Sequence, residues 1–113
     1  MSDIHGYLKE QGFKGGDFDR FSKGRLYWRR VDGHPNPCLT NDKLSVHVTV
    51  YETNIPPHPV SRSVECEIVG EYREGRWVKI QVYSLSWEEL MANGELDRVQ
   101  GELVRAWDAL YGS

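Results

Sequence analysis

Residues 70–90, with the sequence GEYREGRWVKIQVYSLSWEEL, contain the clearest fold signals of the chain. Apolar and polar residues alternate on both sides of Glu74 and Gly75, which is typical of two strands joined by a tight turn. Ser86 and Glu89 then have the spacing of a capping box, in which each side chain bonds the other residue's backbone N–H. The stretch therefore predicts a β-hairpin that leads directly into a helix.

The length of the turn decides which residues of this hairpin share a face. A two-residue turn at Glu74 and Gly75 would put Ile68 opposite Gln81, which mixes apolar and polar side chains on one face. A three-residue loop that begins at Arg73 puts Ile68 opposite Ile80 and keeps the two faces distinct. We therefore predict the longer loop, which also pairs Cys66 with Val82, Glu67 with Gln81, and Glu71 with Trp77.

The rest of the chain adds two strands and two helices to this hairpin and its helix, and it extends the first strand of the hairpin back to residue 63. Alternating patterns predict strands over residues 25–31, 43–52 and 63–72, with loops rich in proline and other turn residues at 32–42 and 53–62. A first helix is expected between an N-cap at Ser2 and a stop at Gly12, and two C-terminal helices are expected on either side of Asn93-Gly94, the second ending near Tyr111. The glycine-rich segment between the first helix and the first strand is predicted to be irregular, with Phe13, Phe18 and Phe21 packed on the core.

These elements predict one α+β domain over residues 1–113. We expect a four-stranded, mainly antiparallel sheet, with the N-terminal and C-terminal helices packed on one face and the other face open. The length of 113 residues suits one domain, and the net charge of −3 argues against a dedicated binder of duplex DNA. No apolar run is long enough to span a membrane and the N-terminus has no apolar signal core, so a cytoplasmic location with reduced thiols at Cys38 and Cys66 is expected.

The open face is the first candidate for a functional surface, because it gathers aromatic and charged side chains that are common in protein interfaces. Cross-strand pairing of the same residues on a solvated sheet would explain the pattern equally simply. The residues predicted to bind a protein partner, or a second copy of the chain, are Arg29, Tyr51, Trp77, Lys79 and Tyr83.

A second candidate is the basic and aromatic segment KGRLYWRR at residues 23–30, which could bind single-stranded nucleic acid by ion pairing and base stacking. A solvated edge strand protected by arginine is the simpler alternative. The residues of this alternative site are Lys23, Arg25, Tyr27, Trp28, Arg29 and Arg30.

A third candidate is a small metal- or thiol-dependent enzyme built from His34, Cys38 and His58. The three residues lie in the two proline-containing loops, and no closely spaced ligand pair supports a zinc site. A Cys38–His34 nucleophile pair is equally unspecific. No cofactor, metal site or catalytic set is therefore predicted.

In its organisation the chain resembles small accessory proteins of bacteriophages and prophages, which are short, single-domain, rich in tryptophan and without catalytic motifs. The resemblance implies a non-enzymatic binder that inhibits or redirects a host protein such as a defence nuclease. It assigns no role to individual residues. The function expected from the sequence is protein binding.

Overall fold

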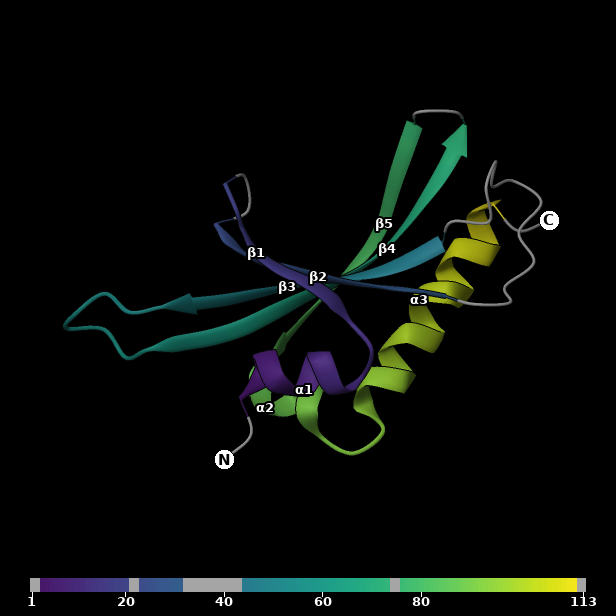
Figure 1. The fold of residues 1–113 in the computed structure, drawn as a ribbon. Coiled ribbons are helices and arrows are strands. Elements are labelled where there is room, and N and C mark those ends of the chain that lie inside the picture. The colour runs from purple at the N-terminus through teal and green to yellow at the C-terminus, as the bar shows by residue number, and fades with distance from the viewer. Residues whose placement is uncertain (1–2, 21–22, 32–43, 74–75, 112–113) are drawn as a thin grey trace.

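The computed structural model describes residues 3–20, 23–31, 44–73 and 76–111, with the side chains of residues 71–82 and of residue 111 outside the description. Within these ranges the five strands form one antiparallel sheet in the order β1-β2-β3-β4-β5 (Figure 1). The elements along the chain are α1 (Ile4–Glu10), β1 (Lys14–Asp19), β2 (Gly24–Arg30), β3 (Leu44–Thr53), β4 (Ser61–Arg73), β5 (Arg76–Ser86), α2 (Trp87–Met91) and α3 (Glu95–Tyr111). The predicted α+β class is confirmed, with five described strands in place of the expected four.

The additional strand is β1, which lies in the segment that was expected to be irregular. Gly15 and Gly16 have positive φ angles of 93° and 104° and accompany a bulge in the pairing with β2. A Cβ atom on Gly15 would lie 2.7 Å from the carbonyl oxygen of Leu26, so only glycine allows the two strands to approach this closely. The glycines that suggested a loop are therefore what allows an edge strand to form.

The phenylalanines of this segment do not all enter the core. Phe13 is buried, but the side chain of Phe18 is 59% exposed, so the expectation that Phe18 packs on the core was wrong. Phe21 lies outside the described residues. Phe18 follows the bulge of β1 and lies opposite Arg25 of β2.

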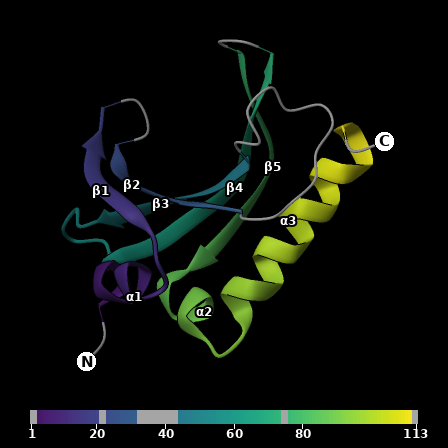
Figure 2. The same cartoon turned by 45° about the vertical axis from the view of Figure 1, so that its right-hand side comes forward.

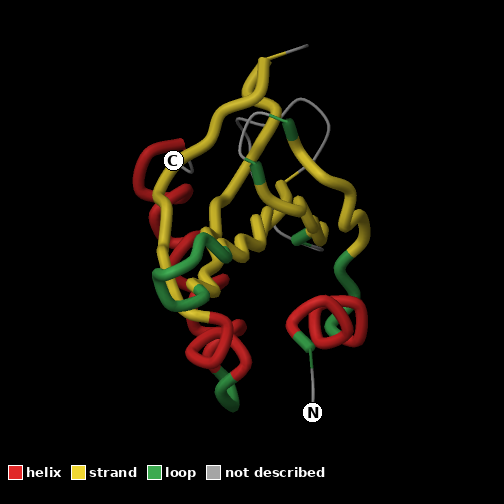
Figure 3. Tube along the Cα trace, turned by 90° about the vertical axis from the view of Figure 1, so that its left-hand side faces the viewer, coloured by secondary structure: helices red, strands yellow, loops and turns green. Residues whose placement is uncertain are grey.

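The main hydrophobic core lies between one face of the sheet and the three helices. In Figure 2, α3 runs along β5 while α1 and α2 lie together near the other end of the sheet, and Figure 3 shows the helices to the left of and below the strands. Alternate residues of β3 and β4 supply the sheet side of the core, as the sequence predicted. The buried core residues are Ile4, Leu8, Phe13, Tyr27, Leu44, Val46, Val48, Val50, Val64, Cys66, Ile68, Leu90, Leu96, Val99, Leu103 and Trp107.

Local signals define both ends of α1. The N-cap is Asp3, one residue later than predicted, and its carboxylate accepts a hydrogen bond from the backbone N–H of His5. After the helix, the N–H groups of Gly12 and Phe13 donate to the carbonyl groups of Lys9 and Leu8, which is the Schellman arrangement expected at a glycine stop.

The C-terminal helices match their sequence signals closely. The capping box of Ser86 and Glu89 is formed at the start of α2. Gly94 has a φ angle of 78°, and α3 begins immediately after it. The predicted break at Asn93-Gly94 is therefore confirmed.

Arg73 pairs with Arg76, so the predicted three-residue loop beginning at Arg73 was wrong, but a register shift between Glu71 and Arg73 leaves the next part of the β4–β5 pairing in the predicted register. Ile68 lies opposite Ile80 and Glu71 opposite Trp77, as expected. A bulge then shifts the register, so that Cys66 pairs with Tyr83 in place of the expected Val82. The shift places Tyr83 on the same face as Cys66, which is the helix-covered face.

Candidate functional site at the base of a projecting hairpin

The hairpin of β3 and β4 extends well beyond the strands on either side of it (Figure 1). The pairing of β2 with β3 stops at Val50, and the pairing of β5 with β4 stops at Ser63. Beyond these positions only Glu52 with Arg62 and Thr53 with Ser61 form strand pairs, residues 54–60 are the connecting loop, and every residue from 52 to 62 is exposed. We call these eleven residues the arm.

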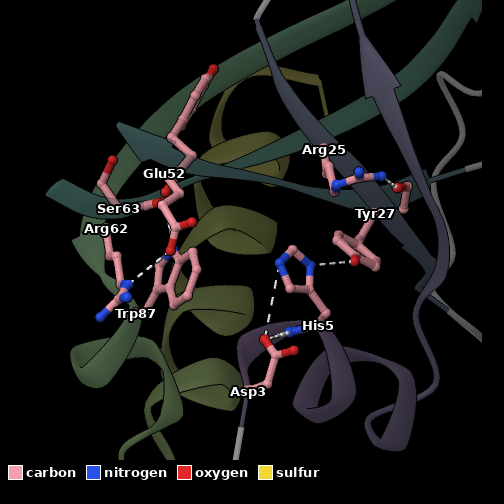
Figure 4. Close-up of polar contacts among 10 residues, drawn as sticks. Asp3, His5, Arg25, Tyr27, Glu52, Arg62, Ser63 and Trp87 are labelled. Carbon is pink, nitrogen blue, oxygen red and sulfur yellow. Dashed lines mark hydrogen bonds and ion pairs between the residues drawn. The ribbon is translucent and has the colours of Figure 1, made fainter. Parts of the chain in front are cut away.

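Trp87, the first residue of α2, fixes the base of the arm. Its indole N–H donates to the carbonyl oxygens of Tyr51 and Ser63, each at 3.1 Å (Figure 4). These two residues face each other across the hairpin at the last position before the arm. One side chain therefore bonds both strands at the point where the arm leaves the sheet.

An ion pair and ring contacts surround this tryptophan. Arg62 donates from Nε to Glu52 at 2.9 Å, and its guanidinium lies 5.4 Å from the centre of the Trp87 ring. His5 approaches the same ring edge-on, with 5.7 Å between the ring centres. Such stacked and cation–π contacts are each worth about 0.5–1 kcal/mol at exposed sites.

Two hollows meet at Trp87. The first, of about 560 Å³, is lined by Asp3, Val60, Arg62, Ser86, Trp87, Glu88 and Met91. The second, of about 170 Å³, is lined by His5, Phe18, Lys23, Gly24, Arg25, Val50, Glu52 and Trp87. The two hollows share Trp87 as a lining residue, and we call the pair the Trp87 groove.

The two hollows have opposite charge. The larger contains Asp3 and Glu88, and the smaller contains Lys23 and Arg25. Arg62 in the larger hollow and Glu52 in the smaller form an ion pair with each other, so their charges cancel. The groove therefore has an acidic end and a basic end on either side of an aromatic ring.

His5 links α1 to β2 at the edge of this groove. Its Nδ1 lies 2.6 Å from the hydroxyl oxygen of Tyr27, and its Nε2 lies 4.0 Å from the Asp3 carboxylate (Figure 4). Burial raises the pKa of Tyr27, so its phenol keeps the proton and can donate it to Nδ1. Tyr27 is only 3% exposed, which leaves its oxygen bonded within the fold and closed to a substrate.

The structure separates the five residues that were predicted to form one binding face. Arg29 pairs with Val46 on the helix-covered side, where it donates to Gln11 and Gln100 and stacks 4.6 Å from the Phe13 ring. Arg29 therefore lies on the face opposite the one where it was predicted to bind a partner. Sequence patterns could not show this, because Gln11 and Gln100 are distant from Arg29 along the chain.

Tyr83 is also on the helix-covered side, contrary to the prediction. Its hydroxyl donates to Glu102 of α3 at 2.6 Å, and this hydrogen bond raises the pKa of Tyr83 and lowers that of Glu102. The register shift in β5 is the physical cause, because one extra residue reverses the face of those that follow.

Of the other three predicted contact residues, the structure describes the side chain of Tyr51 only. Tyr51 is half-buried at the base of the arm, and its hydroxyl lies 3.4 Å from Glu65. In the backbone pairing, Trp77 lies opposite Glu71 and Lys79 opposite Val69. The side chains of Trp77 and Lys79 lie outside the described part of the chain.

The basic segment predicted as a nucleic-acid site is divided between the two faces of the sheet. Arg25, Tyr27 and Arg29 pair with Val50, Val48 and Val46 on the helix-covered face, whereas Trp28 and Arg30 face the other way. Arg25 also donates to the carbonyl oxygen of Gly16 at 2.9 Å. Because Tyr27 is buried and Arg29 is bonded within the fold, they and the exposed Lys23, Trp28 and Arg30 do not form one continuous surface.

The residues of the metal or thiol hypothesis fall mostly outside the description. His34 and Cys38 belong to residues 32–43, which are not described, and His58 is exposed in the turn of the arm. Among the described residues, no group of three or more histidine, cysteine, aspartate or glutamate side chains could hold a metal ion. Cys66 is buried, and burial raises the pKa of its thiol to about 12.

Sequence patterns missed the Trp87 groove. Trp87 follows the predicted capping box directly, but its bonds to Tyr51 and Ser63 depend on where the neighbouring strands end. The loop predicted at residues 53–62 is confirmed for residues 54–60, but its projection beyond the neighbouring strands was not predicted.

Comparisons of the chain with protein-family models, with curated proteins and with solved structures found no match. Within the described ranges, no helix has the length and apolar character needed to cross a membrane.

Proposed function

We propose that this protein is a non-enzymatic protein-binding module and that the arm makes the contact with its partner. The observation that carries the proposal is the exposure of every residue from 52 to 62 on a hairpin that, in the described part of the sheet, has no strand on either side. Ordering the backbone costs roughly 1–2 kcal/mol per residue in conformational entropy, and no residue of the arm is buried in return.

The chemistry of the arm suits a protein surface. Ile55 is 60% exposed near the turn, and Val60 is also exposed where the second strand returns. Ile55 and Val60 lie in the loop that joins the two strands, where exposed apolar residues can enter pockets on the surface of another protein. The clamp at Trp87 supports this role because it holds the arm in a defined direction before binding.

The charge of the arm favours a protein over nucleic acid. Glu52 and Arg62 neutralise each other, and His58 is the remaining ionisable group of the arm. Binding to a phosphate backbone depends on several unpaired cations, and the division of residues 23–30 between two faces weakens that alternative further.

The resemblance to phage accessory proteins suggests which partner to test first. A host protein, such as a defence nuclease, is the class of partner that those small binders engage. Trp77 and Lys79 are retained in this proposal as a second contact surface, whereas Arg29 and Tyr83 are removed from it because they bond within the fold.

The test is site-specific photo-crosslinking in a bacterial lysate, with a photoreactive residue in place of Ile55. The matched control replaces Leu110, which is 65% exposed near the end of α3, a helix end that lies far from the arm (Figure 1). We expect a discrete crosslinked protein from position 55 that position 110 does not give, and loss of that protein from pull-downs with Ile55→Ser. Equal crosslinking from both positions, or capture that survives Ile55→Ser, would contradict the role of the arm.

A further inference from the structure

The Trp87 groove lies beside the arm but has its own chemistry. Lys23 and Arg25 make one end basic, and Asp3 and Glu88 make the other end acidic. All four side chains are exposed. An occupant that fills the whole groove must therefore present a negative group at one end and a positive group at the other.

This requirement argues against occupants of a single charge. Asp3 and Glu88 would repel a phosphate chain, an anionic lipid surface or a uniformly acidic peptide, whereas Lys23 and Arg25 would repel a basic peptide. A patch with both signs is instead complementary to itself when it is rotated by 180° about an axis perpendicular to its centre. Two-fold dimers use such patches. A residue at one end of the patch in the first copy contacts a residue at the other end of the same patch in the second copy, and the reverse contact also forms.

The centre of the groove has the composition of an interface core. Trp87 lies between the two ends, with Phe18 in the basic hollow and Val60 and Met91 in the acidic hollow. Phe18 and Val60 are among the most exposed large apolar residues of the described chain. Aromatic residues and methionine are enriched at the centres of interfaces, where charged residues form the rim.

We infer that two copies of this chain associate through the Trp87 groove, with Lys23 and Arg25 of each copy facing Asp3 and Glu88 of the other. The axis passes close to Trp87 and brings the apolar side chains of the two copies together. Glu52, Val60 and Arg62 of the arm line the groove, but Ile55 does not, so the dimer leaves Ile55 exposed for the partner contact proposed above.

Charge reversal tests the pairing directly by sedimentation velocity over a series of protein concentrations. We expect the wild-type chain to dimerise, and Arg25→Glu and Glu88→Lys each to weaken the dimer by about tenfold or more, because each change occurs twice in a symmetric interface. Mixing the two variants in equal amounts should restore association. The carboxylate introduced at position 25 of one chain then faces the ammonium introduced at position 88 of the other, and the unchanged Arg25 and Glu88 also meet.

Two matched controls separate this effect from a general change of charge. Arg30→Glu makes the same change on the same strand but on the opposite face, and Asp97→Lys changes an acidic residue in the first turn of α3, outside both hollows. Both should leave dimerisation within about twofold of wild type. Circular dichroism confirms that each variant is folded.

The inference is overturned if the wild-type chain stays monomeric at every concentration, or if mixing the two reversed variants gives no more association than either alone. A monomer whose position 55 still crosslinks a partner would overturn the dimer and leave the proposed function standing. A dimer that captures no partner through its arm would overturn the proposed function and leave the inferred dimer standing.

Discussion

The two halves of the β3–β4 hairpin belong to one strand pair but have opposite surroundings. In the inner half, which we call the packed half, residues 44–50 pair with residues 64–70, lie between β2 and β5, and are covered on one face by helices. In the arm, the same two strands continue for two more pairs without a neighbour among the described strands, a loop at residues 54–60 joins them, and every residue is exposed. Strand pairing thus extends only briefly into the arm, and the burial that stabilises the packed half does not reach it.

The comparison shows how the molecule divides its tasks. Burying a valine or isoleucine side chain stabilises a fold by about 1.5–3 kcal/mol, and the packed half buries several of them. The arm contributes little to stability. Its residues are therefore not constrained by packing and can serve in binding instead. Trp87 lies at the boundary, where it bonds both strands.

The largest expected effect comes from a matched pair of isoleucine substitutions on this hairpin. Ile68→Ala in the packed half removes a side chain that is 0% exposed and should lower the free energy of unfolding by about 2–5 kcal/mol. Ile55→Ala in the arm should change it by less than about 0.5 kcal/mol. Urea denaturation measures both, and similar losses would mean that the arm is packed in solution.

A smaller loss of stability is expected when Arg29, which connects β2 to the helices by hydrogen bonds, is replaced. Arg29→Ala removes hydrogen bonds to Gln11 and Gln100 and the contact with Phe13, so we expect a loss of about 1–3 kcal/mol. Arg30→Ala, one position along the strand and exposed, is the control and should stay within about 0.5 kcal/mol. Equal stabilities of the two variants would show that Arg29 is dispensable to the fold.

The boundary itself is tested by Trp87→Phe, which keeps an aromatic ring but removes the indole N–H. The lost bonds to Tyr51 and Ser63 should cost about 0.5–1.5 kcal/mol. Hydrogen exchange should become faster at the base of the arm and stay unchanged around Ile68. If exchange rises uniformly over the whole hairpin, Trp87 supports the sheet in general and does not clamp the arm.

The smallest expected effect is a change in one ionisation equilibrium between β5 and α3. The hydrogen bond from Tyr83 is the main cause that lowers the pKa of Glu102, so Tyr83→Phe should raise that pKa towards its ordinary value of 4.5. A carboxylate with a lowered pKa stabilises the fold above its unfolded pKa and loses this contribution as the pH falls through the folded pKa. The variant should therefore lose less stability than wild type on acidification below about pH 4.5.

Carbon-detected NMR titration of the glutamate side chains measures this change residue by residue. Glu95 provides an internal control, since its pKa is lowered mainly by Arg98 and should not respond to the loss of Tyr83. An unaltered Glu102 titration in Tyr83→Phe would mean that the hydrogen bond is absent in solution.

Much of this fold follows from the sequence because the deciding interactions are local. The capping box of Ser86 and Glu89 and the break at Gly94 each involve residues a few positions apart, and the structure contains both. Along β3 the predicted apolar positions are buried, but Ser45 and Thr49, which were expected on the open face, are buried as well. The α+β class and the helix-covered face follow from these elements, because apolar faces must be buried against one another.

Tertiary structure alone decided the features that matter for the candidate site. The pairing of β1 depends on how closely Gly15 can approach Leu26, and the face of Tyr83 depends on one bulge in a strand. The arm exists because β2 and β5 both end before it, which no pattern within residues 52–62 can encode. The Trp87 groove combines residues from α1, β1, β2, the hairpin and α2, and its division into acidic and basic ends arises only when folding brings these distant side chains around one ring.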